Sequence, residues 1–464
     1  MCLLALAGLT LLRLILAARL PLTPDEAYYW LWSQHLQAGY FDHPAMVAIW
    51  IKAGTLIAGS TPLGVRLLGP ISCALGSALL WRAGEDFFPG RNAGIIAAAA
   101  LNATLLIGVG AIVMTPDTPV IFFWAAAIAG LGRLHATGRE EWWLVIGAAI
   151  GLALLSKYTA VLLALSIAFW LLASPSGRAA LRSIWPWAGA AAAVLVFLPN
   201  VIWNAQHHWI SYFKQGGRVA GFDTGRAAQY FAELVVSQFG LATPLIFGLA
   251  GIGLWQLGRT RSHATAVLIW LTALPLAVFV EHIASGRVEA NWPAVLYPSA
   301  CLAIAALPAS ILRRWLKPAY ALGFAMTGLV YVQAMAAPFP LPAHADPAAL
   351  QLSGWQGFAD KVAAFHPAFV TSDEYGPAAE LAFLLPPSIP VVGFYRKLDP
   401  RWGTFGMKTA GLAGSTGVLV TRRTDTACPV PLGTIGRMRG NQTVLTYRVC
   451  RVVAPAQGVL LPRP

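Results

Sequence analysis

Carboxylates gather in the first polar segment of the chain, directly after an apolar stretch at residues 2–21. They lie in two motifs, Thr23-Pro24-Asp25-Glu26 and Gly39-Tyr40-Phe41-Asp42-His43-Pro44. A charged carboxylate at the edge of an apolar segment costs free energy, so each of these residues is a candidate for a functional or capping role. Asp25 and Glu26 could simply cap a helix that begins after Pro24. Together with Asp42 and His43, however, they suit general acid–base or metal chemistry.

Another acid and several cations lie between later apolar stretches. Asp117 stands in a two-proline turn, Lys157 is isolated between two apolar runs, and His207, Arg218 and Arg287 follow in polar segments. A carboxylate can deprotonate a hydroxyl, and cations can neutralise a departing phosphate. Each residue also has a plainer interpretation. The acid could cap its turn, the lysine could extend to the membrane interface, and the rest could be solvated loop residues.

The composition is that of a membrane protein. Of 464 residues, 57% are hydrophobic and 11% are charged, against roughly a quarter charged in soluble domains. A soluble chain of this size cannot bury so much apolar surface, and disordered, coiled-coil and disulfide-rich secreted chains are excluded too. The net charge is +13. The positions of the basic residues indicate the orientation of the chain in the membrane and the binding of a phosphate-bearing lipid. They do not point to nucleic acid as a partner.

Apolar windows near the length of a transmembrane helix recur along the first 336 residues. The predicted fold class is therefore an all-α polytopic membrane protein with about 11 transmembrane helices. The windows are 2–21, 63–81, 92–113, 118–134, 142–156, 158–173, 185–202, 235–257, 264–281, 292–311 and 318–336. The first window could instead be a cleaved signal peptide, although its basic residues follow the apolar run and do not precede it.

The distribution of arginine predicts how the chain is oriented in the membrane. Five short turns carry Arg82 and Arg91, Arg133 and Arg139, Arg178 and Arg182, Arg259 and Arg261, and Arg313, Arg314 and Lys317. The positive-inside rule makes these turns cytoplasmic. The external segments are then 22–62, 114–117, 157, 203–234, 282–291 and everything after 337. All the acids and cations singled out above therefore lie on the external side.

The proline-rich break at 337–342 divides the chain into a membrane domain, 1–336, and an external α/β domain, 337–464. The membrane domain includes an external loop at 22–62 with two interfacial helices. In the tail, 355–365 is predicted as an amphipathic helix, and 369–371, 391–394, 417–421 and 445–450 as short strands. Whether Cys428 and Cys450 form a disulfide is left open by the sequence.

Several motifs resemble those of the GT-C glycosyltransferases that use polyprenyl-phosphate sugars. The resemblance is to the branch of the protein O-mannosyltransferases and the lipid A aminoarabinose transferase, and it covers roughly the first 300 residues. It rests on Pro24-Asp25-Glu26-Ala27-Tyr28-Tyr29, Gly39-Tyr40-Phe41-Asp42-His43-Pro44, Gly64-Val65-Arg66-Leu67, Thr115-Pro116-Asp117-Thr118-Pro119, Leu155-Ser156-Lys157-Tyr158-Thr159 and Asn200-Val-Ile-Trp203-Asn204. The tail is similar as well, through Gly354-Trp355 and Glu374-Tyr375.

The resemblance implies roles for particular residues. Asp25 would be the catalytic base, beside Glu26. Asp42 would be a second acidic position near the metal or the acceptor, and Asp117 would shape the same cavity. Lys157 would bind the donor phosphate, and Arg218 and Arg287 are weaker candidates for that role. The cavity would also be lined by Tyr28, Tyr29, His43, Tyr158 and His207. A divalent metal near Asp42 and His43 is an open alternative that no strong ligand spacing supports.

The activity implied is an inverting transfer of a sugar from a polyprenyl-phosphate donor to an envelope acceptor, which could be lipid A or its core, a glycan or a protein. The protein would lie in the inner membrane of a bacterium, in contact with membrane lipids, with its tail in the periplasm. A transporter or flippase for a lipid-linked sugar is the competing class, because intramembrane charges and broken helices mark transport pathways too. An envelope scaffold is a third class, which leaves the first-loop motifs unexplained.

Overall fold

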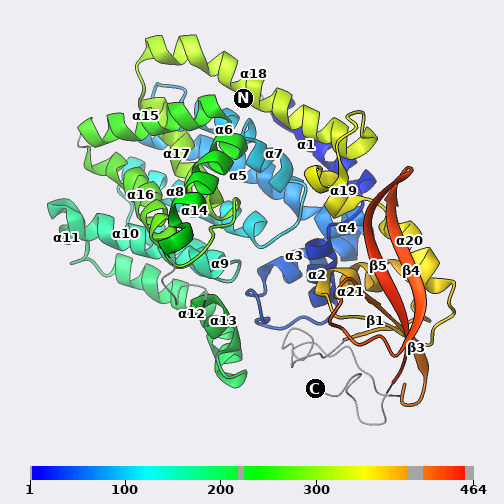
Figure 1. Cartoon of the computed structure of the whole chain (residues 1–464). Coiled ribbons are helices and arrows are strands. Elements are labelled where there is room, and N and C mark those ends of the chain that lie inside the picture. The colour runs from blue at the N-terminus through cyan, green and yellow to red at the C-terminus, as the bar shows by residue number, and fades with distance from the viewer. Residues whose placement is uncertain (1–2, 218–223, 261, 394–410, 455–464) are drawn as a thin grey trace. The chain divides into compact units, whose positions relative to one another are not determined.

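The computed structural model describes residues 3–217, 224–260, 262–393 and 411–454. Its helices before the proline-rich break are α1 (Leu3–Arg19), α2 (Pro24–Gln34), α3 (Met46–Ala58), α4 (Pro62–Arg66), α5 (Leu68–Phe87), α6 (Ala93–Asn102), α7 (Leu105–Gly110), α8 (Asp117–Thr137), α9 (Trp142–Leu154), α10 (Val161–Ala173), α11 (Pro175–Ala180), α12 (Trp185–Gln206), α13 (Ile210–Gly216), α14 (Ala227–Ala242), α15 (Pro244–Thr260), α16 (His263–His282), α17 (Tyr297–Ala303) and α18 (Ala309–Ala336). Short 3-10 helices are η1 (Tyr158–Ala160), η2 (Thr224–Arg226), η3 (Trp292–Leu296) and η4 (Ile304–Ala306) (Figure 1).

Several of these helices are long and apolar enough to cross a membrane. Within the described residues there are five, at Pro62–Phe87, α8, α12, α16 and α18, or up to seven if two bent helix pairs each form one span. The protein is therefore a multi-pass membrane protein. The predicted number of about 11 spans stays a prediction, because several apolar helices, such as α6 and α9, are shorter than a full span.

Several of the predicted windows are not single helices; 292–311, for example, holds η3, α17, η4 and the start of α18. Residues 92–113 hold α6 and α7, because Thr104 starts a new helix by accepting a hydrogen bond from the Ile107 N–H at 3.2 Å. Residues 235–257 are broken at Thr243, which has a φ of 68° and is followed by Pro244, so that α14 and α15 bend by 103°. Capping residues and proline therefore end helices inside runs that are apolar throughout.

The chain divides into two compact units. The first contains Met1–Leu16, Asp42–Val47 and Arg66–Leu329, and the second contains Ala17–Phe41, Ala48–Val65 and Val330–Pro464. Asp25 and Asp42, which lie in one external loop of the sequence, therefore belong to different units. The predicted boundary at 336/337 stays a prediction, since the second unit also takes segments from the first loop.

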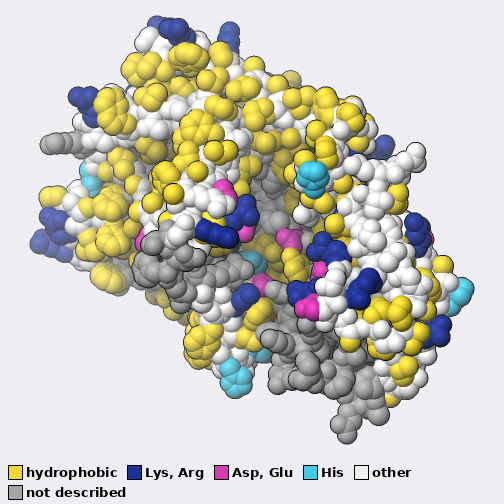
Figure 2. Space-filling view, in the orientation of Figure 1, with side chains coloured by type: hydrophobic (Ala, Val, Ile, Leu, Met, Phe, Trp, Pro, Cys, Tyr) yellow, Lys and Arg dark blue, Asp and Glu magenta, His cyan; other side chains and the backbone are white. Residues whose placement is uncertain are grey.

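In the first unit, small residues let helices meet along their backbones. A Cβ atom added to Gly147 in α9 would lie 1.9 Å from the carbonyl oxygen of Gly189 in α12, so only glycine allows this approach. Large apolar side chains face outward over neighbouring helices, among them Val236 of α14 and Trp255 of α15. In Figure 2 the surface over α14 and α15 is mainly hydrophobic. Such a surface is suited to lipid.

The second unit contains a five-stranded sheet of order β2-β1-β3-β5-β4. β1 (Val370–Ser372) pairs in parallel with β2 (Val391–Gly393) and β3 (Thr416–Thr421), while β5 (Gln442–Val453) pairs antiparallel with β3 and β4 (Val430–Arg439). The remaining elements are η5 (Ala343–Ala345), α19 (Pro347–Leu352), α20 (Trp355–Ala363) and α21 (Tyr375–Leu384). Side chains of α20, β3 and β5 form its core. This sheet confirms the predicted small α/β domain.

The predicted strands and the helix of the tail are confirmed, with shifted ends. The prediction missed β4, α19 and α21. β4 is largely exposed along its first half and contains Pro431 and Gly433, so it lacks the alternating apolar pattern of a half-buried strand. A disulfide joins Cys428 to Cys450 of β5, with the Cα atoms 5.3 Å apart.

Candidate active site

A buried ion pair joins two of the predicted site residues. Lys157 follows α9 in an extended conformation, and its Nζ donates a hydrogen bond to Oδ1 of Asp117 at 2.7 Å. Asp117 is the first residue of α8, after the turn at Thr115 and Pro116. The two side chains are only 9% and 12% exposed. At such burial each charge depends on the other for its neutralisation.

A third residue completes the environment of Asp117. The amide Nδ2 of Asn291 donates to Oδ2 of Asp117 at 2.8 Å, so both carboxylate oxygens accept a hydrogen bond. Asn291 lies in the segment before η3, in the same external loop of the sequence as Arg287. Arg287 is exposed and forms an ion pair with Glu233 at 3.0 Å. Its predicted role in phosphate binding is untested and stays a prediction.

The Asp42 segment lies next to the Lys157 turn. The N–H of Met46 donates to the carbonyl of Leu155 at 2.9 Å, two residues before Lys157. The Gln215 side chain of α13 donates to the carbonyl of Asp42 at 2.6 Å. Asp42 is half-buried. The first unit therefore brings Met46, four residues after Asp42, against the segment that carries Lys157.

A group of amides and phenols follows Lys157. The Nδ2 of Asn204 lies 3.3 Å from the hydroxyl of Tyr158 and donates to it, and the ring of Tyr158 meets the edge of Tyr212 with centroids 5.2 Å apart. The hydroxyl of Tyr212 donates to Oδ1 of Asn200 at 3.3 Å. Asn200 and Asn204 are fully buried in α12. Amides within an apolar helix are a signal for a site, as is Asn291 in its loop, but no role was predicted for these three residues.

His207 contacts its own helix. Its Nδ1 lies 2.7 Å from the carbonyl of Trp203, and its ring stacks on the Trp203 ring with centroids 4.0 Å apart. These contacts hold the imidazole against the end of α12. Its place in a substrate cavity stays a prediction. Arg218 lies outside the described residues.

The second unit holds the first acidic motif. Asp25 is exposed near the start of α2 and accepts a hydrogen bond from the hydroxyl of Tyr375 at 2.7 Å. Glu26 is fully buried and closes a capping box with Thr23, whose N–H donates to the Glu26 carboxylate at 2.9 Å. The plainer interpretation, a helix cap, therefore describes Glu26, and its predicted catalytic role is untested.

Aromatic rings surround the start of α2. Tyr28 and Tyr29 are buried, and the ring of Tyr28 lies 5.0 Å from that of Tyr375. Tyr375 was quoted as part of a tail motif, without a role. The predicted convergence of Asp25 with Lys157 in one external cavity concerns two different units, and it stays a prediction.

The residues offered for a metal were Asp42 and His43. Within the described part of the chain, His, Cys, Asp and Glu form no group of three or more that could hold a metal ion. Two adjacent residues supply too few ligands for a zinc or calcium site. A divalent metal near Asp42 and His43 stays a prediction.

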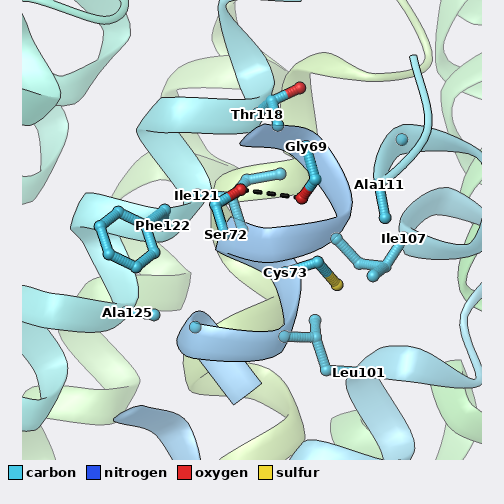
Figure 3. Close-up of a pocket in the computed structure, with 12 residues that line it drawn as sticks. Gly69, Ser72, Cys73, Leu101, Ile107, Ala111, Thr118, Ile121, Phe122 and Ala125 are labelled. Carbon is cyan, nitrogen blue, oxygen red and sulfur yellow. Dashed lines mark hydrogen bonds between the residues drawn. The ribbon is translucent and has the colours of Figure 1, made fainter. Parts of the chain in front are cut away.

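Apolar cavities accompany the polar site in the first unit. One lies between α5, α7 and α8, next to Thr118, and Ser72 on its wall donates its hydroxyl to the carbonyl of Gly69 at 2.9 Å (Figure 3). Another, of about 510 Å³, lies between α9, α10 and α12 and is lined almost wholly by apolar side chains. It includes Phe197, whose ring lies 6.5 Å from Tyr158. The larger cavity can accept hydrocarbon, and neither cavity is lined by a charged side chain.

Comparison with solved structures decides the fold. The crystal structure of ArnT from Cupriavidus metallidurans bound to undecaprenyl phosphate matches with a TM-score of 0.69 and 16% identity, over 96% of this chain and 97% of that chain. The apo structure of the same protein gives a TM-score of 0.68. The chain has the ArnT fold. The resemblance to GT-C glycosyltransferases is confirmed, and so is the predicted fold class apart from the number of spans.

Sequence comparisons agree with the ArnT fold. A family model described as dolichyl-phosphate-mannose-protein mannosyltransferase matches residues 42–203, which include Asp42, Asp117 and Lys157 but not Asp25. The lipid A galacturonosyltransferase RgtD of Rhizobium johnstonii is 29% identical over 290 residues. That match covers 59% of this chain and 58% of RgtD, so the chain spans little more than half the length of this relative.

Proposed function

We propose that this protein is an inverting glycosyltransferase that moves a sugar from a polyprenyl-phosphate donor to an envelope acceptor. The observation that carries the proposal is the buried Lys157–Asp117 pair in a chain with the ArnT fold. A buried lysine at the end of an apolar helix is expensive unless it has a functional partner. The solved ArnT structure holds undecaprenyl phosphate, and RgtD acts on lipid A, which supports a lipid-linked donor and an envelope acceptor.

The reaction is a single displacement at the anomeric carbon. Asp25 accepts the proton of the acceptor hydroxyl while the hydroxyl oxygen bonds to the anomeric carbon from the face opposite the phosphate. The bond from that carbon to the phosphate oxygen breaks, and its electron pair leaves with the polyprenyl phosphate. Because one displacement occurs, the configuration is inverted. Lys157 neutralises the charge that develops on the phosphate.

Asp117 and Asn291 have a supporting part in this proposal. A lysine ammonium has three donors, and the described contact with Asp117 uses one of them. The carboxylate, held from its other side by Asn291, fixes the direction of the ammonium. Lys157 can then face the donor phosphate with its remaining donors. Asp42, in the same unit as Lys157, is the second acidic position of the site, near the acceptor, and Arg287 and Arg218 remain weaker candidates for the phosphate.

The donor tail needs an apolar surface next to the phosphate site. The cavity between α9, α10 and α12 supports such a place, because α9 ends three residues before Lys157 and Phe197 adjoins Tyr158. We assign the first isoprene units to this cavity. Tyr158 and the amides of α12 would then stand between the hydrocarbon and the sugar phosphate.

The proposed location is the inner membrane of a bacterium, with the tail in the periplasm. The arginine-rich turns support this orientation, and the Cys428–Cys450 disulfide suits an oxidising compartment. Cysteines introduced at exposed Gln442 and exposed Thr137 test it in spheroplasts. A membrane-impermeant maleimide should label Gln442→Cys and leave Thr137→Cys unlabelled until the cells are lysed. The reverse pattern would reject the orientation.

The deciding experiment is transfer in vitro by the purified full chain. Polyprenyl-phosphate galacturonate and lipid A are the first probes, because RgtD is named for that sugar and that acceptor. We expect free polyprenyl phosphate and a product with inverted anomeric configuration. Asp25→Asn should slow transfer by about 10²- to 10⁴-fold. Asp360→Asn, an exposed acid on α20, is the matched control.

The outcomes separate the candidate functions. Wild-type transfer by Asp25→Asn would reject the base assignment. Sugar that crosses a vesicle membrane while its link to the lipid phosphate stays intact would instead establish the transporter. Neither transfer nor transport with any lipid-linked sugar of the envelope would favour the scaffold.

A further inference from the structure

Tyr375 of the C-terminal domain reaches back to the first acidic motif. Its hydroxyl donates to Oδ1 of Asp25 at 2.7 Å, across 350 residues of sequence. Both residues belong to the second unit. We propose that Tyr375 is a positioning residue for Asp25, so that the C-terminal domain is part of the catalytic apparatus. This inference rests on the proposed function, in which Asp25 is the base.

Helix packing brings the two residues together. α2 and α21 lie side by side (Figure 1). A Cβ atom added to Gly376 would lie 2.9 Å from Cβ of Pro24, so the residue after Tyr375 must be small for the two helix starts to meet. At the far end of α21, the ring of Phe383 meets the edge of Trp30, with centroids 5.0 Å apart. The contact therefore extends along both helices and does not depend on one hydrogen bond.

The sheet holds Tyr375 from its other side. Glu374, the residue before it, forms an ion pair with Arg422 at the end of β3, with Nη2 2.9 Å from Oε2 and Nε 3.0 Å from Oε2. One residue earlier, Asp373 accepts hydrogen bonds from Thr421 at 2.8 Å and from Thr426. The turn between β1 and α21 is therefore tied to β3. This attachment restricts the movement of Tyr375.

The side chain of Asp25 is exposed, and the hydrogen bond from Tyr375 therefore affects how it is oriented for the reaction. An exposed carboxylate samples several rotamers, and a base must point at the hydroxyl that it deprotonates. A charge-assisted hydrogen bond from a fixed phenol selects one rotamer. Because Tyr375 acts through Asp25, it should influence the chemical step. The affinity for the lipid-linked donor should not depend on it.

The test is Tyr375→Phe in the purified full chain, assayed with the lipid-linked donor and acceptor that the wild-type protein uses. We expect kcat to fall about 10- to 100-fold, as for loss of a hydrogen bond to a charged group, with the donor KM unchanged. Phe383→Leu is the matched control, because it weakens the same helix contact and leaves the hydrogen bond in place. It should keep kcat close to the wild-type value.

A double variant separates positioning from a structural effect. Asp25→Asn with Tyr375→Phe should be no slower than Asp25→Asn alone, because the tyrosine has no carboxylate left to orient. A wild-type kcat in Tyr375→Phe, or multiplicative losses in the double variant, would overturn the inference and leave the proposed function intact. Full activity of Asp25→Asn would instead reject the base assignment itself.

A second variant covers the case in which Tyr375→Phe misfolds. Arg422→Gln loosens the anchor of Glu374 and leaves the phenol present. We expect a several-fold loss of kcat with the donor KM unchanged and an intact Cys428–Cys450 disulfide. An unchanged kcat in this variant would count against the inference.

Discussion

The ammonium of Lys157 lies 2.7 Å from the carboxylate of Asp117, and both side chains are almost fully buried. The two residues are 40 positions apart, at the end of one apolar helix and the beginning of another. A pair of this kind contributes little net stability compared with apolar residues, yet the loss of one partner is costly. The proposed role of Lys157 in binding the donor phosphate would account for a pair of this kind at this place.

Removal of the lysine should damage both stability and transfer. Lys157→Met leaves Asp117 buried without its counter-ion, which we expect to cost about 3–5 kcal/mol. Thermal unfolding of the purified protein measures the loss. The double variant Lys157→Met with Asp117→Asn should unfold near the wild-type temperature and remain inactive. An active double variant would contradict a role for the lysine in binding the donor phosphate.

Glu26 should behave as a helix cap. Glu26→Ala removes its part of the capping box with Thr23, which typically costs about 1 kcal/mol. Because its carboxylate is fully buried in this box, we expect Glu26→Gln to transfer sugar at a rate within a few-fold of wild type. Parallel assays of Glu26→Gln and Asp25→Asn distinguish the two acids. A loss in Glu26→Gln as large as in Asp25→Asn would assign it a catalytic role instead.

The disulfide should stabilise the C-terminal domain. Cys428 and Cys450 enclose a loop with a sequence separation of 22, for which the chain-entropy model gives about 3 kcal/mol. Dithiothreitol should therefore lower the unfolding temperature of the wild-type protein. The double variant Cys428→Ala with Cys450→Ala should already have the lower value and should not respond to reductant. A response of that variant would place the effect at another cysteine.

Low pH should reduce the stability of the C-terminal domain, because it protonates Asp346. Burial by itself raises the pKa of Asp346, but hydrogen bonds from Gln333 and the Ala349 N–H and the nearby Arg439 outweigh it and lower the pKa. A lowered folded-state pKa gives stability that is present above the unfolded-state pKa, about 3.9, and is lost as the pH falls through the folded value.

Unfolding temperatures of wild type and Asp346→Asn between pH 7 and pH 3 check this prediction. The difference between them should shrink below about pH 4. A difference that is constant over this range would show that the charge of Asp346 does not matter for stability.

Local features of the sequence were sufficient for much of the architecture. Apolar windows identified the five helices that are long and apolar enough to cross a membrane, although not the number of spans. The proline run marked the end of α18, and alternating apolar residues identified most strands of the tail. A helix that begins after Pro24 was also predicted, with Asp25 and Glu26 in its first turn, and α2 starts at Pro24. These features depend on neighbours within a few residues, and such patterns can be recognised without knowledge of the fold.

The tertiary structure alone decided which of these residues meet. The sequence placed Asp117 and Lys157 on one side of the membrane, but their ion pair and the hydrogen bond from Asn291, 174 positions after Asp117, depend on how the helices pack. The bond from Tyr375 to Asp25 depends on the docking of α21 against α2. Such contacts join segments far apart in sequence. Their geometry is set by the shapes of all the side chains packed between them, which no local pattern records.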